Sequence, residues 1–253
     1  MTESDSGQKT LTGNALIVGM LGGTPVTTGG LTWFPVTQLL LWVIMTRLSR
    51  KNKPDKGFFW HISEGALTSS ALLGAEWCHN LAHVFLADRI GKPMDELRIQ
   101  LGMPRCIYNE INDREVSPRQ HIIRSLGGPL INLLLIPVAA LVKFTSKPGS
   151  IAWETAHVFL KTNQFLFAVS LLPIPGIDGG PILKWSLVDK GYEIEEADQV
   201  VQKINGPLSI ILGLFSSWSF RKKKNLLGIF SGLLALISLA VFTGLFKEDE
   251  IPL

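Results

Sequence analysis

The fold class is decided by a run of residues without charge, NLLGIFSGLLALISLAVFTGLF, which extends from Asn225 to Phe246. This run has the length of about 20 mostly apolar residues that a helix needs to cross a bilayer. Four more uncharged stretches meet or approach that length, at residues 10–46, 125–142, 162–177 and 204–220. Only 18% of the residues are charged, whereas soluble domains average about a quarter. The sequence therefore predicts an integral membrane protein that crosses the bilayer several times.

The basic residues cluster beside apolar stretches, at residues 47–56, 143–147 and 221–224. Cytoplasmic loops of membrane proteins are enriched in Lys and Arg, so the three loops predict one common cytoplasmic side. This distribution and a net charge of only +3 favour membrane orientation over nucleic-acid binding. Because the N-terminal residues do not have the composition of a transit peptide, we expect a multi-pass protein of a prokaryotic plasma membrane.

We expect an all-α membrane protein with about six transmembrane helices. Its expected parts are a polar tail at 1–10, membrane segments and a basic loop at 11–64, a core at 65–187, a polar loop at 188–203, a transmembrane hairpin at 204–246 and a tail at 247–253. The stretch from Leu11 to Gly30 is rich in Gly and Thr. Its composition suits a span, a re-entrant segment or an interfacial segment equally.

A short β-hairpin-like insertion is expected between the helix at 65–87 and the next span. Leu97 to Leu101 alternates apolar and polar residues, which is typical of a strand, and Cys106 to Ile111 could pair with it. Cys78 and Cys106 are the only cysteines, so we do not expect a disulfide framework.

Two histidines in an apolar helix are the first candidates for chemistry. His79 and His83 are four residues apart, so their side chains point the same way one turn apart and could bind one metal ion. Asp178 is the natural third ligand, because it ends a stretch whose density of Pro and Gly breaks a helix and needs polar surroundings in a membrane. Alternatively, the histidines bond to each other or to the backbone, and Asp178 lies in an ordinary interfacial loop.

Three motifs, in this order, resemble the site-2 protease family of intramembrane zinc metalloproteases (peptidase family M50). EWCHNLAH at 76–83 resembles the family's HExxH, GPLIN at 128–132 its Gly-Pro-x-x-Asn helix start, and LLPIPGIDGG at 171–180 its motif ending in Leu-Asp-Gly-Gly. The resemblance covers roughly residues 65–187. It implies spanning helices that hold Zn²⁺ through His79, His83 and Asp178, and hydrolysis of peptide bonds within membrane-spanning substrates.

Two positions depart from the family pattern. Asn80 stands where the motif has the Glu that takes a proton from water, and an amide cannot act as a general base. Ser170 stands where the family has an Asn that supports the developing oxyanion, and losing one such donor typically lowers the rate by about 10²–10³. The metal ligands are thus kept, whereas both catalytic helpers are changed.

Glu76 is the residue that could compensate for the missing base. It precedes His79 by three positions and lies on the same helical face. It could act as a relocated base, serve as an extra ligand, or bond the outer nitrogen of His79. It could equally face a water-filled cleft without a role.

The first hypothesis is a zinc-binding homologue with reduced or no peptidase activity, a pseudoprotease that binds membrane-spanning segments as substrates or clients. The second is an active intramembrane protease that uses Glu76 or zinc-activated water. A di-iron enzyme is remote because the chain has only five histidines, and a transporter is remote because the sequence lacks repeated halves. The first hypothesis predicts that Asn80→Glu creates or raises proteolytic activity.

Overall fold

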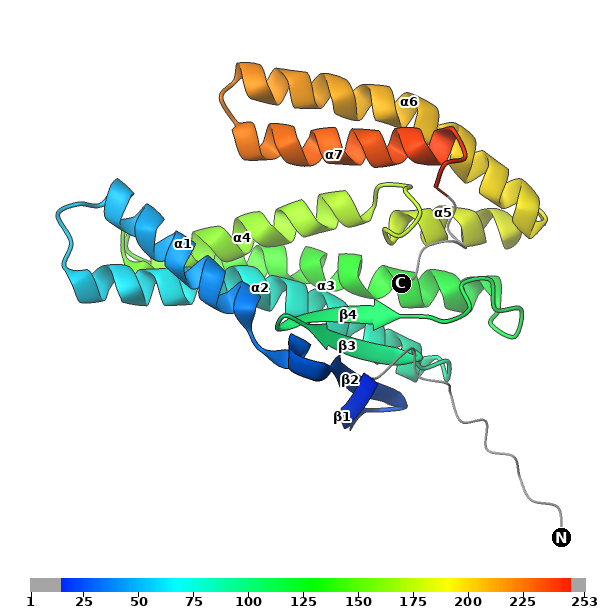
Figure 1. Cartoon of the computed structure of the whole chain (residues 1–253), viewed down its shortest axis with the longest axis horizontal. Helices are drawn as coiled ribbons and strands as arrows, with labels where there is room; N and C mark the ends of the chain where they lie inside the picture. The colour runs from blue at the N-terminus through cyan, green and yellow to red at the C-terminus, as the bar shows by residue number, and fades with distance from the viewer. Residues whose placement is uncertain (1–14, 247–253) are drawn as a thin grey trace, which may run out of the picture. The chain divides into compact units, whose positions relative to one another are not determined.

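The computed structural model describes residues 15–246, so the tails expected at 1–10 and 247–253 and the first residues of the 11–30 stretch lie outside the described part. The chain forms seven α-helices, four strands and one short 3₁₀-helix within that part (Figure 1). In chain order these are β1 (Ala15–Leu21), β2 (Thr24–Gly29), η1 (Gly30–Trp33), α1 (Val36–Asn52), α2 (Phe58–Arg89), β3 (Glu96–Gln100), β4 (Met103–Ile107), α3 (Pro118–Thr145), α4 (Ile151–Ser170), α5 (Gly179–Val188), α6 (Ile194–Arg221) and α7 (Asn225–Phe242).

The chain divides into two compact units. The first unit contains the described residues up to Asn109 together with Leu134–Asn163, and so includes the sheet, α1 and α2. The second unit contains Glu110–Leu133 and the described residues from Gln164, and so includes α5, α6 and α7. Helices α3 and α4 each contribute residues to both units.

The expectation of an all-α protein is corrected by a four-stranded sheet with the order β1-β2-β3-β4. The described part of the 11–30 stretch forms the hairpin of β1 and β2 and the first residue of η1, and not a spanning helix. Gly22 and Gly23 form its two-residue turn, where Gly22 has a positive φ of 56° that suits glycine. The hairpin has the uncharged composition of a span, but its residues form strands and not a helix.

The expected β-hairpin insertion is confirmed as β3 and β4, which pair antiparallel. The second strand begins at Met103, three residues before the predicted Cys106, because the turn at Leu101 and Gly102 is tight. Both turn residues have positive φ, and the Gly102 carbonyl accepts hydrogen bonds from Gln38 Nε2 (2.7 Å) and Trp77 Nε1 (3.2 Å). Gln38 of α1 and Trp77 of α2 therefore hold this turn beside both helices.

The core of the first unit lies where the sheet packs on α2. Val84 and Ala87 of α2 are buried with Met94 and with Leu97 of β3. Val84 and Ala87 lie in the turn of α2 that follows the histidine motif. The packing therefore fixes the sheet against the helical turn that carries the candidate site.

Two of the described helices, α3 and α7, are long and apolar enough to cross a membrane. After Asn225, the exposed side chains of α7 are apolar, and Leu233 and Leu236 are 54% and 64% exposed, whereas Ser231 and Ser238 are buried. This is the reverse of a helix on the surface of a water-soluble protein, which turns its polar side outward. The expected C-terminal hairpin is thus present as two helices, while the count of six spans stays a prediction.

The polar loop expected at 188–203 is shorter than predicted, because α6 already begins at Ile194. The backbone N–H of Glu193 donates to the Glu196 carboxylate at 3.2 Å, which completes a capping box. Two acidic residues in the first turn, Glu195 and Glu196, also favour the positive end of the helix dipole. The charges that suggest a loop are therefore start signals of the helix.

Candidate metal centre

The two histidines lie on one face of α2, as their spacing predicts. Their Nε2 atoms are 3.2 Å apart, and the rings meet edge to face with centroids 4.8 Å apart. His83 is 6% exposed and His79 is half-buried. Because α2 is a continuous helix of 32 residues, this spacing is set by helix geometry and does not depend on a loop.

The separation of the two nitrogens is the one that a shared metal ion requires. Zinc binds imidazole nitrogen at about 2.0–2.1 Å, so two ligands at a tetrahedral angle stand about 3.3 Å apart. The observed 3.2 Å between the Nε2 atoms of His79 and His83 matches this value. The alternative, a hydrogen bond between the two rings, uses the same geometry and differs only in having a proton between the nitrogens.

Asn80 occupies the turn between the histidines and is bonded at both ends of its amide. Its Nδ2 donates to the Glu76 carboxylate at 3.2 Å and to the Glu76 carbonyl at 3.0 Å. Its Oδ1 accepts from the Cys106 thiol at 3.3 Å. Since Asn80 is 8% exposed, water has little access to this amide. A neutral side chain therefore links the helix to strand β4 where the family's motif has a carboxylate.

The hydrogen bonds of Asn80 also position Glu76. Its Oε1 accepts a hydrogen bond from Asn80, one turn farther along the helix. The carboxylate of Glu76 is thus oriented by the residue that replaces the base. Whether it serves as a base, a ligand or a support for His79 stays a prediction.

Asp178 belongs to the second unit and stands at the N-terminus of α5. Residues 171–178 turn tightly before it, with backbone hydrogen bonds from Ile174 to Leu172 (2.8 Å) and from Ile177 to Ile174 (3.0 Å). Pro173 and Pro175 cannot continue a helix, which agrees with the break expected from the sequence. We call residues 171–178 the ligand loop.

Two glycines allow the ligand loop to fold back on the start of α5. A Cβ atom on Gly179 would lie 2.4 Å from the Leu172 carbonyl oxygen, and one on Gly180 would lie 2.5 Å from the Ile174 carbonyl oxygen. Both distances are far below van der Waals contact. The Gly-Gly pair after Asp178 is therefore required by the close approach of the backbone.

Ser170 is the last residue of α4 and is 6% exposed. Its hydroxyl donates to the Phe167 carbonyl at 3.3 Å, a bond within its own helix. A hydroxyl used in this way satisfies the end of the helix. Its predicted place at the oxyanion position stays a prediction.

Cys106 is the residue of this site that sequence reasoning missed. It lies on β4 and contacts Asn80 through both the side-chain and main-chain oxygens of that residue. The expected hairpin insertion was the available signal, but the strand's position against α2 depends on packing between distant segments. Cys78 and Cys106 are not joined by a disulfide.

Comparison with known proteins finds a relative and a similar solved structure, both from Methanocaldococcus jannaschii. No family model matches the chain. The chain is 34% identical to a protein of Methanocaldococcus jannaschii described as a "putative zinc metalloprotease". The alignment spans 83 residues, which are 33% of this chain and 42% of that protein. The chain thus aligns with less than half the length of this relative. A solved structure, the site-2 protease from Methanocaldococcus jannaschii, has a TM-score of 0.47 and 20% sequence identity, covering 94% of this chain and 96% of that chain.

Proposed function

We propose that this chain, which is 34% identical over 83 residues to a protein described as a "putative zinc metalloprotease", is a multi-pass membrane protein that binds zinc and recognises membrane-spanning segments, with little or no peptidase activity. One observation carries the proposal. The two imidazole nitrogens of His79 and His83 have the spacing of two ligands of one metal ion, while an amide held at both ends occupies the position of the base.

The donor set suits zinc. Two imidazole nitrogens and the carboxylate oxygen of Asp178 are ligands that zinc prefers, and three protein ligands leave a fourth position for water. His79 and His83 would be held by the rigid helix α2, and Asp178 by the ligand loop. When bound, zinc supplies a Lewis acid for peptide hydrolysis.

The side chains around the histidines support weak catalysis. The Asn80 amide neither gains nor loses a proton near neutral pH, and its N–H donor and its oxygen acceptor are both hydrogen-bonded. Ser170 uses its hydroxyl within α4. A site with ligands but without a base or an oxyanion donor would bind zinc and a peptide segment better than it would cleave the peptide.

The apolar side chains exposed on the helices favour partners that also lie in the membrane. Exposed leucines and isoleucines on α7 can only be solvated well by lipid or by another apolar helix. A partner that spans the bilayer meets the same solvent as this chain. We therefore propose that transmembrane segments of other proteins are its substrates or clients.

The test is metal analysis of the purified protein together with a cleavage assay. We expect wild type to bind one zinc ion, and His83→Ala and Asp178→Ala to lose most of this affinity while remaining folded by circular dichroism. Transmembrane peptides should stay intact or be cut slowly. Equal zinc affinity in wild type and both variants would overturn the metal site.

An active protease is the second candidate, because the Glu76 carboxylate is oriented one turn before His79 by its bond with Asn80. This candidate predicts cleavage that disappears in both His79→Ala and Glu76→Gln. Cleavage that disappears in His79→Ala but persists in Glu76→Gln would exclude Glu76 as the base and leave zinc-activated water.

A further inference from the structure

The ligand loop is fastened to α6 by one buried asparagine. Asn205 is fully buried, and its Nδ2 donates to the Pro173 carbonyl at 2.8 Å and to the Val201 carbonyl at 2.8 Å. No helix or strand ladder can use the Pro173 carbonyl, because it lies in an irregular stretch. A carbonyl that is removed from water without a hydrogen-bond donor destabilises the fold, so the bond from Asn205 favours this conformation of the loop.

Asn205 is itself held in one orientation by α7. The Ser238 hydroxyl donates to Asn205 Oδ1 at 2.6 Å and to the Asn205 carbonyl at 3.2 Å, and Ser238 is also fully buried. The hydroxyl proton faces Oδ1, so the amide group must present its Nδ2 to Pro173. The two residues form a chain of hydrogen bonds from α7 through α6 to the ligand loop.

Apolar packing acts on the same loop from the same two helices. Ile174 is fully buried against Leu212 of α6 and Leu234 of α7. Pro207 lies inside α6, two residues after Asn205, and removes one backbone donor from the helix. Figure 1 shows that α6 changes direction along its length. Asn205 and Leu212 of α6 thus both contact the loop, through Pro173 and Ile174.

We propose that Asn205 and Ser238 are positioning residues, which set the metal-binding conformation of the ligand loop and therefore the place of Asp178. This inference rests on the proposed zinc function. Four residues separate Pro173 from Asp178 in the chain, so a shift of the Pro173 carbonyl is passed directly to the carboxylate. Loss of groups that orient metal ligands typically lowers metal affinity about 10- to 100-fold.

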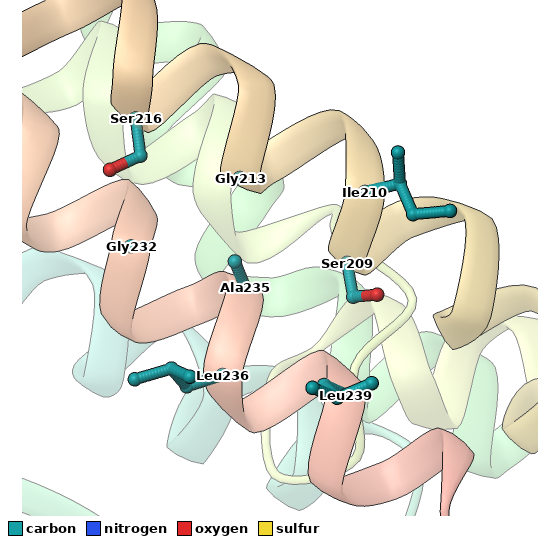
Figure 2. Close-up of a pocket in the computed structure, with 8 residues that line it drawn as sticks. All are labelled: Ser209, Ile210, Gly213, Ser216, Gly232, Ala235, Leu236 and Leu239. Carbon is teal, nitrogen blue, oxygen red and sulfur yellow. The ribbon is translucent and has the colours of Figure 1, made fainter.

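The matched control is Ser216, a buried serine on the same pair of helices. Its hydroxyl donates from α6 to the Gly228 carbonyl of α7 at 2.7 Å. Ser216 lines a cavity of about 510 Å³ between α6 and α7, where its side chain points towards α7 (Figure 2). Ser216→Ala therefore removes a comparable hydrogen bond between the same helices and does not touch the ligand loop.

The experiment compares Asn205→Ala, Ser238→Ala and Ser216→Ala with wild type in two measurements. Zinc affinity is measured by competition with a chelator. Amide hydrogen exchange of residues 171–178 is measured on metal-free protein. We expect Asn205→Ala to weaken zinc binding about tenfold or more and to speed exchange in the loop. Ser238→Ala should do the same to a smaller extent, and Ser216→Ala should leave both values unchanged.

The outcomes separate this inference from the proposed function. Both Asn205→Ala and Ser216→Ala should melt at a lower temperature than wild type. If Asn205→Ala nevertheless keeps the zinc affinity and the slow loop exchange of wild type, the positioning role is wrong. If wild type and Asp178→Ala bind zinc equally, the zinc site is wrong, and the exchange measurement still decides whether Asn205 controls the loop. A cobalt-loaded Asn205→Ala protein with an altered visible spectrum would support a displaced ligand.

Discussion

At the scale of single residues, Asn80 determines what the histidine pair can do. Its amide donates to Glu76 and accepts from Cys106, so it is part of a small buried network and not a vacant position. Buried polar networks resist partial replacement, because the loss of one partner leaves another unsatisfied. The substitution of a base by an amide is thus accompanied by neighbours that fit the amide.

The first prediction concerns the restoration of a carboxylate at position 80. From the motif alone, Asn80→Glu should create activity, but the contacts place the new carboxylate beside Glu76, where like charges repel. We expect Asn80→Glu alone to cleave transmembrane peptides weakly, and Asn80→Glu with Glu76→Gln to cleave them at least tenfold faster per bound zinc. Asn80→Gln is the control, since it keeps the amide and should stay inert. Equal rates for the single and double variants would rule out the repulsion.

The residue scale also shows how far the sequence could predict the site. The spacing of His79 and His83 could be read directly, because both lie in one helix whose geometry is local. The contact of Cys106 with Asn80 could not, because it joins residues that are 26 positions apart and depends on how β4 packs on α2. Local spacing was predictable, whereas the neighbours that tune it were not.

At the scale of elements, an ion cluster joins α1, α2 and α4 in the first unit. Lys53, directly after α1, bonds Glu64 of α2 at 2.9 Å and Glu154 of α4 at 2.8 Å. Glu64 also accepts from Ser49 (2.9 Å) and Trp60 (2.8 Å). Partial burial opposes the charged form of Lys53, but the hydrogen bonds that it donates to Glu154 and Glu64 outweigh this effect and raise the pKa of the lysine. The charge of one lysine is therefore shared by two acidic side chains on two helices.

The second prediction is that Lys53→Met lowers the melting temperature in detergent, because it leaves Glu64 buried without its cation. Removing one partner of a buried pair costs about 3–5 kcal/mol, and about 1–2 is expected here because Lys53 is partly exposed. A raised pKa means that the stabilisation is complete below the ordinary value of 10.5 and is lost only as the pH rises through the folded value. The difference from wild type should thus be constant between about pH 7 and pH 9. Lys51→Met, at an exposed position, should not change the melting temperature, and an equal effect would remove the argument.

The third prediction concerns the glycine pair at the start of α5. Alanine at Gly179 or Gly180 would force its Cβ into carbonyl oxygens of the ligand loop, so each variant should lose about 1–3 kcal/mol and bind zinc more weakly. Gly213→Ala is the control within a helix, because its Cβ would meet nothing within 4 Å. It should be neutral or gain up to about 1 kcal/mol from helix propensity. Thermal unfolding and chelator competition measure both effects.

Element boundaries show a different limit of the sequence. Charge-free length located α7, whose length and hydropathy suit a span, but it placed the start of the preceding helix at residue 204, whereas α6 begins at Ile194. The same measure did not distinguish residues 15–29 from a span, because a strand hairpin of apolar and Thr residues is also free of charge. The distinguishing signal is the turn at Gly22 and Gly23, where the Gly23 N–H donates to Asp88 at 2.8 Å. That contact joins distant segments and leaves no periodic pattern.

At the scale of the whole molecule, the exposed apolar side chains indicate the solvent of the fold. The described helices expose large apolar side chains such as Leu134 (64%), Ile210 (66%) and Leu236 (64%). The polar side chains of Asn163, Asn205 and Ser238 are buried instead. Water would penalise this arrangement, whereas hydrocarbon would stabilise it.

The fourth prediction tests this solvent directly. Leu236→Arg places a charge in the middle of α7, which costs about 2.5–3.5 kcal/mol in a membrane. Leu226→Arg lies near the start of α7 beside Lys222, Lys223 and Lys224, where an arginine can reach the interface. We expect Leu236→Arg to melt at a lower temperature than wild type in detergent micelles and Leu226→Arg to melt at the wild-type temperature. Equal melting temperatures of the two variants would contradict the placement of α7 in hydrocarbon.

The amide that joins Glu76 and Cys106 has a consequence for the history of such chains. A descendant that regained a glutamate at position 80 would meet a carboxylate already in place, and the gain would be small until position 76 had also changed. Inheritance of the altered motif would then be hard to reverse one substitution at a time. A base at position 80 and the side chain at position 76 would therefore have to change together.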